Sequence, residues 1–284
     1  MVQLHQDIRG SDGFTYPKPV LLPDETNRVY LFWCGADWST DFAARDPDGG
    51  WGPATDLIRS RGERPSLKVA DNGSDAIALA FTNGHPRNVL TSVYYAAYRH
   101  GSLWRASGRW ITRLDAAPIS PRQADVVYDA KATTVPAWVW DVAFGPNGRP
   151  VIGYATFPTR REDVYWYATF NGRRRVSHRM TGAEGSISPG TIEHEHSGGI
   201  APDHSNPSIA YVSKQVAGGW EIQRWSTANG GSTWHRQTVA VADGTDNVRP
   251  VVPRGADAGS IGLLWLRGTY GRYTSYRPWI AFLK

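Results

Sequence analysis

The sequence predicts an all-β domain, and within that class a β-propeller of about five four-stranded antiparallel blades. Short apolar or alternating runs are separated by clusters of Gly, Pro, Asn and Asp, which is the pattern of strands and turns. The runs recur in similar sets at a spacing of roughly 40–50 residues, the period of propeller blades. The 13 Trp and 13 Tyr suit half-buried, pleated strands. Because each unit buries its faces against its neighbours, the units are expected to stack in a ring.

A single propeller domain is expected over residues 1–284. Its blades are expected at about residues 17–58, 64–115, 136–180, 197–241 and 248–284. The first four sets contain four runs each, whereas the fifth contains three: Val248–Pro253, Ile261–Leu266 and Tyr276–Phe282. Residues 116–135 are less regular and contain Pro118 and Pro121, so we expect a long connection between the second and third blades there.

Two kinds of turn support the blade assignment. The Asn-Gly pair in Asp71-Asn72-Gly73 favours a tight hairpin. Residues 226–234, Ser-Thr-Ala-Asn-Gly-Gly-Ser-Thr-Trp, fit the Asp-box pattern with Asn229 in place of the aspartate, and residues 46–51 are a looser copy. Such a box is a structural hairpin between the third and fourth strands of a blade, so it indicates a propeller and carries no information about catalysis.

Charge and cysteine content narrow the function classes. The formal charge is +5 and the pI about 9.3, but the basic residues are scattered, and the one dense run, Arg173–Arg175, follows the turn Asn171-Gly172. Nucleic-acid binding would require a basic stripe or a known module, so no nucleic-acid partner is expected, whereas an acidic polysaccharide is compatible with the charge. Cys34 is the single cysteine, so no internal disulfide can form. No apolar run reaches eighteen residues, so no membrane partner is expected.

A family resemblance rests on several motifs in one order. These are Gly62-Glu63-Arg64-Pro65, Ala80–Asn88, Ser92–Tyr95, Trp138–Ala143, Tyr165–Ala168, Ser197–His204, Glu221–Trp225 and Asn247–Pro250. Together they resemble the BNR-repeat-containing proteins related to propeller-fold ulvan lyases, which are polysaccharide lyases. The likeness extends from about Tyr16 to Tyr276. Members usually form seven blades and this chain resembles the last five, so either the ring closes with five blades or two further blades precede it.

The resemblance implies a monomeric protein, secreted or periplasmic although the chain opens without a signal-peptide pattern, that cleaves a uronic-acid polysaccharide or oligosaccharide by β-elimination. This reaction needs neutralisation of the carboxylate, a base for the C5 proton and an acid for the leaving oxygen. His85, before the strand-ending Pro86, and Tyr154 match the family's catalytic histidine and tyrosine. The expected substrate-binding residues are Arg87, Asn88, Tyr95, His196 and Arg249. Two positions depart from the family pattern: Thr169 replaces an expected arginine, and His196 an expected tyrosine.

Other interpretations of the same residues stay open. His85 fits a turn-capping histidine, and Tyr154 fits a core tyrosine on an apolar strand. No cofactor is required, but His194 and His196 share a strand face and, with His204 or a carboxylate, could ligate a structural zinc ion. A glycoside hydrolase would need paired carboxylates, and nothing in the sequence marks two of Asp37, Asp141, Asp163 and Glu221 as partners. A non-catalytic carbohydrate-binding propeller is the third hypothesis.

Overall fold

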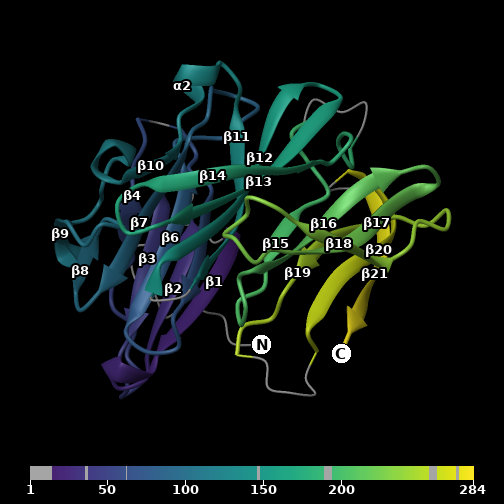
Figure 1. Cartoon of the computed structure of the whole chain (residues 1–284). Coiled ribbons are helices and arrows are strands. Elements are labelled where there is room, and N and C mark those ends of the chain that lie inside the picture. The colour runs from purple at the N-terminus through teal and green to yellow at the C-terminus, as the bar shows by residue number, and fades with distance from the viewer. Residues whose placement is uncertain are drawn as a thin grey trace.

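The computed structural model describes residues 15–35, 38–61, 63–145, 148–188, 194–255, 261–272 and 275–284. Five antiparallel sheets are arranged as a five-bladed β-propeller with almost no helix (Figure 1). Apart from one strand of blade 2, the strands within each sheet follow one another in chain order. The first strands of successive blades contact each other from blade 1 to blade 5, so they surround the axis of the ring.

The strands divide among the blades as follows. Blade 1 contains β1 (Thr15–Leu22), β2 (Arg28–Cys34), β3 (Thr40–Arg45) and β4 (Thr55–Ile58). Blade 2 contains β5 (Leu67–Asp71), β6 (Ala76–Thr82), β7 (Val93–Arg99), β8 (Ser102–Trp104), β9 (Trp110–Arg113) and β10 (Asp125–Tyr128). Blade 3 contains β11 (Ala137–Phe144), β12 (Pro150–Thr159), β13 (Glu162–Phe170) and β14 (Arg175–Gly182). Blade 4 contains β15 (Ile200–Pro202), β16 (Ile209–Val216), β17 (Gly219–Ser226) and β18 (His235–Ala240). Blade 5 contains β19 (Asn247–Val251), β20 (Leu263–Arg272) and β21 (Ser275–Leu283).

Burial differs sharply between an inner strand of blade 2 and an outer strand of blade 4. The second strand of blade 2, β6, is apolar except for Thr82 and buried at every residue, because sheets cover it on both faces. The outer strand of blade 4, β18, is exposed at its first four residues and has the polar sequence HRQTVA. These two strands have the compositions that their layers require, and such contrasts made the repeat visible in the sequence.

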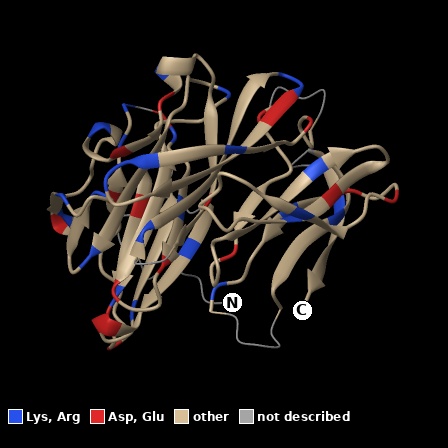
Figure 2. Ribbon diagram, in the orientation of Figure 1, with Lys and Arg blue, Asp and Glu red and all other residues tan. Residues whose placement is uncertain are grey.

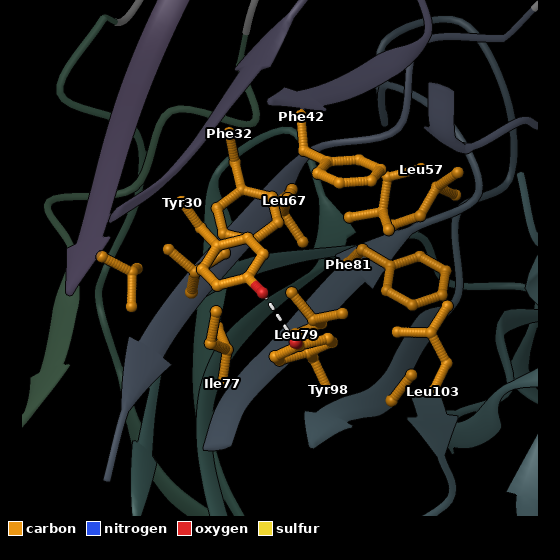
Figure 3. Packing of buried hydrophobic residues seen from close by; sticks show 14 of the residues in the cluster. Tyr30, Phe32, Phe42, Leu57, Leu67, Ile77, Leu79, Phe81, Tyr98 and Leu103 are labelled. Carbon is orange, nitrogen blue, oxygen red and sulfur yellow. Dashed lines mark hydrogen bonds between the residues drawn. The ribbon is translucent and has the colours of Figure 1, made fainter. Parts of the chain in front are cut away.

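Apolar clusters fill the seams between neighbouring blades. The cluster between blades 1 and 2 contains Phe32, Leu79 and Phe81, and the hydroxyls of Tyr30 and Tyr98 meet within it at 2.6 Å (Figure 3). Further clusters lie between blades 2 and 3, 3 and 4, and 4 and 5. Burial of this apolar surface is the main favourable term that holds the blades together.

The connection between blades 2 and 3 contains more structure than the sequence indicated. Residues 125–128 form β10, which pairs with β7, so the sheet of blade 2 has six strands. A short helix, α2 (Ala130–Thr133), follows, with the Asp129 side chain accepting the Lys131 N–H at its start. The prolines of this region suggested an irregular connection. They lie outside β10 and not within it, so they do not prevent its pairing with β7. No helix within the described residues is long and apolar enough to cross a bilayer.

The predicted hairpin at residues 226–234 joins β17 and β18. The Asn229 side-chain oxygen accepts the Thr233 N–H at 2.9 Å, and Thr227 Oγ1 accepts the Gly231 N–H at 2.9 Å. Trp234 packs edge-on against Tyr167 of blade 3, with ring centroids 5.0 Å apart. The turn therefore has a structural role in the seam between blades 3 and 4.

Candidate functional site

Several predicted residues meet at one end of the propeller, here called the proximal end, where the first strand of each blade begins. Because strands alternate in direction, the loop between the second and third strands of each blade lies at this end too. His85 lies in such a loop, between β6 and β7. Thr82 Oγ1 donates a hydrogen bond to the Gly84 carbonyl at 2.7 Å, and a Cβ at Gly84 would come within 2.6 Å of the Val89 side chain. This tight packing fixes His85, whose side chain is 7% exposed.

Trp138, near the start of β11, contacts the imidazoles of both His85 and His196. Its ring centroid lies 4.6 Å from that of His85, in an edge-on arrangement, and 5.4 Å from that of His196. The indole N–H donates a hydrogen bond to Ser66 Oγ at 2.8 Å, which fixes the ring. Histidines from two separate loops therefore meet on a single aromatic side chain.

Both imidazoles are neutral near pH 7. Burial and, to a smaller extent, the charges of Arg87 and Arg64 lower the pKa of His85 to about 4. Burial also lowers the pKa of His196 to about 4, with repulsion from Arg249 as the next cause. The Arg87 backbone N–H donates to His85 Nδ1 at 3.2 Å, so neutral His85 carries its proton on Nε2.

Two β-bulges aim Trp140 and Arg249 at each other. The register of β11 against β12 shifts between Val139 and Asp141, which leaves Trp140 as the extra residue. The register of β19 shifts around Arg249, which adopts a φ of 61° and donates its N–H to the Gly198 carbonyl at 2.7 Å. The Arg249 guanidinium carbon lies 4.6 Å from the centroid of a Trp140 ring, a cation–π contact.

Three cations come from the first strands of three blades: Lys18 on β1, Lys68 on β5 and Arg249 on β19. We call them the axial cations. The Lys68 ammonium lies 6.0 Å from the centroid of a Trp140 ring, and the Lys18 ammonium donates to the Tyr16 carbonyl at 2.6 Å. Basic residues occur in all parts of the ribbon, so composition alone does not mark this group (Figure 2).

The axial cations affect one another's ionisation. Burial lowers the pKa of Lys18 to about 8, and repulsion from Lys68 is the next cause. Burial also lowers the pKa of Lys68, while Asp141 raises it and Arg249 lowers it. Asp141 is itself bound to His204, with Nε2 and Oδ2 3.1 Å apart. The group is therefore a partly desolvated concentration of positive charge with one carboxylate near it.

The predicted site residues fall into two sets. Near Trp138 lie His85, Arg87, Asn88, His196 and Arg249. Arg87 and Asn88 are exposed, and the Asn88 side-chain oxygen accepts the Arg87 Nε–H at 3.3 Å. These five residues occupy one region, and their roles stay predictions.

Tyr154 and Tyr95 do not join them. Tyr154 is 1% exposed and stacks on Trp166 with centroids 6.2 Å apart, on the face of blade 3 that packs against blade 2. It pairs with Val139, so it points away from the face that carries Trp138. Apolar packing between blades 2 and 3 therefore sets the position of Tyr154, and its catalytic role stays a prediction.

Tyr95, predicted to bind substrate, is 2% exposed and belongs to the same seam between blades 2 and 3. A ring so enclosed cannot stack on a sugar. Thr169, at the position of the family's expected arginine, lines the outer part of this seam with Tyr95 and Arg175. It lies on β13, the third strand from the axis, so it faces the seam and takes no part in the Trp138 region.

The zinc alternative finds no assembled ligand set. His194 Nε2 lies 3.2 Å from Glu195 Oε1, whereas His204 is bound to Asp141. Among the residues that the structure describes, no group of three or more His, Cys, Asp or Glu side chains is arranged to hold a metal ion. Asp37, one of the carboxylates considered for hydrolysis, lies outside the described residues.

A buried carboxyl group lies at the proximal end of the seam between blades 3 and 4. Asp163 is 0% exposed, and neither of its side-chain oxygens has a hydrogen-bond partner among the described residues. Burial and, to a smaller extent, the neighbouring Glu195 raise its pKa to about 8. Asp163 is therefore mainly protonated near pH 7.

Sequence reasoning missed Lys18, Lys68, Trp138 and Trp140 as site residues. Each lies on the first strand of its repeat, and the first strands surround the axis. That position was a signal that could have found them, because an axial lysine in a ring of apolar strands is unusual. The bulges that aim Trp140 and Arg249 had no comparable sequence signal.

A family model described as a BNR repeat-containing family member matches residues 2–181. The chain belongs to this family. No curated protein matches the chain. Among solved structures, an ulvan lyase, a polysaccharide lyase bound to the saccharide -[GlcA(1-4)Rha3S]-, superposes with a TM-score of 0.71 at 13% identity. The match covers 97% of this chain and 65% of the ulvan lyase chain, so this chain spans less than two thirds of that protein.

Two other solved structures are less similar to this chain. A Hadza microbial sialidase has a TM-score of 0.53 at 10% identity, over 96% of this chain and 59% of the sialidase. A thermostable family-43 glycoside hydrolase has a TM-score of 0.50 at 11% identity, over 98% of this chain and 91% of the hydrolase. At such identities these likenesses describe the fold and leave the chemistry to the site itself.

Proposed function

We propose that this protein cleaves a uronic-acid-containing polysaccharide by β-elimination at the proximal end of the propeller. One observation carries the proposal: two neutral imidazoles, His85 and His196, contact Trp138 while the cations Arg87 and Arg249 act on them electrostatically. Family membership and the fold likeness to an ulvan lyase support it. A secreted or periplasmic location and action as a monomer belong to the same proposal.

His85 is assigned to the substrate carboxylate. Its Nδ1 accepts the Arg87 N–H, so Nε2–H is the group available as a donor. A hydrogen bond from Nε2–H to the carboxylate, together with the Arg87 and Arg249 charges, would stabilise the negative charge that develops when C5 loses its proton. His85 then acts as an electrophile and needs no change of tautomer.

His196 is assigned as the base. It removes the C5 proton, the electrons of the C5–H bond form the C4–C5 double bond, and the C4–O4 bond breaks. The resulting imidazolium returns the proton to O4 of the departing chain, so protons and electrons balance. The carboxylate of a bound uronate would also raise the pKa of the neighbouring His196, which makes it a stronger base in the complex than in the free protein.

The test measures ultraviolet absorbance of unsaturated uronate while the protein is incubated with a panel of uronic-acid polysaccharides that includes ulvan. A steady rise is expected with at least one substrate. His196→Ala and His85→Ala are each expected to lower kcat by about 100-fold or more, the usual range for loss of a general base or an oxyanion donor. His100→Ala is the matched control, because His100 lies at the opposite end of blade 2 with 68% of its side chain exposed.

The pH profile is a second test. Both histidines must be neutral, so kcat/KM for the free protein is expected to be constant above pH 5 and to fall as the pH drops through about 4. An acid limb centred near pH 6.5, the value of an ordinary histidine, would contradict the assigned site.

Other outcomes separate the competing functions. Release of reducing ends without ultraviolet absorbance would favour a glycoside hydrolase, although the interacting carboxyl groups Asp163 and Glu195 are both buried. Binding without any product, from folded protein, would favour a carbohydrate-binding propeller. Either result would overturn the lyase proposal.

A further inference from the structure

The axial cations concentrate positive charge that the described residues balance only in part. Among the described residues, neither Lys18 nor Lys68 has a carboxylate within ion-pair distance, and Asp141, the anion that acts on Lys68, is engaged by His204. Holding like charges together away from water is unfavourable unless an opposite charge or hydrogen bonds compensate. The contacts of Lys68 and Arg249 with Trp140, and of Arg249 with Tyr270, compensate only in part, since a cation–π contact contributes about 0.5–2 kcal/mol.

We propose that Lys18, Lys68 and Arg249 form an oxyanion-binding site on the axis of the propeller, with Trp140 packed against it. The ligand is a carboxylate or sulfate group. Its assignment to the acidic group of a sugar rests on the proposed function, whereas the oxyanion site itself does not. The lysines donate from blades 1 and 2 and the guanidinium from blade 5, so an anion at this position would be held from three blades.

The geometry of each member supports a built site. Arg249 is held in a left-handed backbone conformation with φ 61° in a β-bulge, which is unfavourable for a side chain of this size and persists where the surroundings require it. Gly199 has a φ of 112°, and a Cβ there would lie 3.2 Å from Pro250 and 3.4 Å from Trp140. The absence of a side chain at Gly199 lets the backbone of blade 4 pack closely against Trp140 and Arg249.

The partial exposure of all three cations leaves them open to a small anion. Lys18, Lys68 and Arg249 are each of intermediate exposure. A bound oxyanion would also reverse the effect of the neighbouring charges, so the lysine ammonium groups would hold their protons more tightly. Because the pKa of Lys18 is lowered to about 8, anion binding at pH 8.5 is expected to take up protons from solution.

The experiment is isothermal titration of the full chain with sodium sulfate and, separately, with sodium glucuronate at constant ionic strength maintained with chloride. Repeating it at pH 8.5 in two buffers of different ionisation enthalpy measures proton uptake. Wild-type protein is expected to bind at least one of the two anions with net proton uptake, and the stronger anion identifies the source. Lys68→Met is expected to weaken binding by about tenfold or more, the effect of losing a hydrogen bond to a charged group.

Lys131→Met is the matched control, because Lys131 is exposed on α2 and its side chain takes part in no ion pair among the described residues. Equal affinity in Lys68→Met and Lys131→Met, or no binding of either anion by wild-type protein, would overturn the proposal. If Lys68→Met fails to fold, Lys18→Met provides the same comparison. Anion binding without any lyase product would defeat the proposed function alone, and lyase activity unchanged in Lys68→Met with no anion binding would defeat this inference alone.

Discussion

In the seam between blades 1 and 2, two buried tyrosine hydroxyls are hydrogen-bonded to a carboxylate, whereas in the seam between blades 3 and 4 a buried carboxyl group has no partner among the described residues. In the first seam, the hydroxyls of Tyr30 and Tyr98 each donate to Glu25 at 2.7 Å, and aromatic and aliphatic side chains surround them (Figure 3). In the second seam, Asp163 is enclosed without a partner among the described residues, close to Glu195 and to the loop that carries His196.

The hydrogen-bonded tyrosines and the unpaired Asp163 have opposite effects on stability, and they lie at different distances from the candidate site. A satisfied polar network inside an apolar seam stabilises the fold, while an unpaired buried carboxyl group costs free energy. The unpaired carboxyl group of Asp163 lies at the proximal end, beside the candidate site. The hydrogen-bonded network of Tyr30, Tyr98 and Glu25 lies in a seam that carries none of the predicted catalytic residues. Strain that concentrates near a site is expected where the surroundings are shaped for a ligand and not for maximal stability.

The largest effect is expected from the pH dependence of Asp163. A carboxyl group whose pKa is raised from 3.8 to about 8 on folding stabilises the native state fully below pH 3.8, and this contribution is lost as the pH rises toward 8. Each pKa unit corresponds to about 1.4 kcal/mol, so up to about 6 kcal/mol depends on this window. Urea unfolding at pH 5 and pH 8 is expected to show the loss in wild-type protein and a much smaller loss in Asp163→Asn.

Asp115→Asn is the control for this experiment, since Asp115 is exposed and paired with Arg113. It is expected to keep the wild-type loss of stability between pH 5 and pH 8. If Asp163→Asn showed the same loss of stability between pH 5 and pH 8, Asp163 would not be its source and the contrast between the two seams would not hold.

A smaller effect on the free energy of unfolding is expected from removing an apolar side chain in the seam between blades 1 and 2. Phe81 is fully buried between blades 1 and 2 and packs on Tyr94 with ring centroids 5.7 Å apart. Phe81→Ala is expected to lower the free energy of unfolding by about 3–5 kcal/mol, because it removes buried surface and leaves a cavity. Phe282→Ala on β21, where Phe282 is 55% exposed, is expected to change it by less than about 0.5 kcal/mol. Similar losses in both variants would show that β21 is covered in solution.

The smallest effect is expected from the polar network in that seam. Tyr98→Phe removes the hydroxyl that donates to Glu25 and accepts the Gly101 N–H at 3.1 Å. The expected cost is about 1–2 kcal/mol in urea unfolding, since Glu25 retains its hydrogen bond from Tyr30. Tyr276→Phe, on the exposed β21, is the matched control and is expected to be neutral. A neutral Tyr98→Phe would mean that the network contributes specificity without stability.

The propeller could be predicted from the sequence because its signal is repeated and local. Strands such as β6 and β18 carry the composition of their layer, so period and alternation were enough to find them. The three-stranded fifth blade was also visible as three apolar runs. The strand β10 was missed, because its pairing with β7 is set by tertiary contacts and not by a local pattern.

The candidate site was predictable only in part. His85 and Arg249 stood in family-like motifs, His196 stood directly before one, and the fold brings the three to one region. Tyr154 was matched to the family's catalytic tyrosine, but alternation along β12 turns its ring into the seam with blade 2. Which face a side chain takes depends on bulges such as the one at Trp140, and a single inserted residue reverses every assignment beyond it.

The axial cations come from strands that lie far apart in the sequence, so the charge cluster depends on the order in which the blades fold and pack. Lys18 and Arg249 come from nearly opposite ends of the sequence, and they become neighbours of Trp140 and Lys68 only when the intervening blades have stacked. Contacts between such distant segments form late, because the loop they close is long. Individual blades can therefore acquire their strands well before the molecule acquires its charge cluster, and recovery of anion binding after refolding would report the moment at which the first and last blades come together.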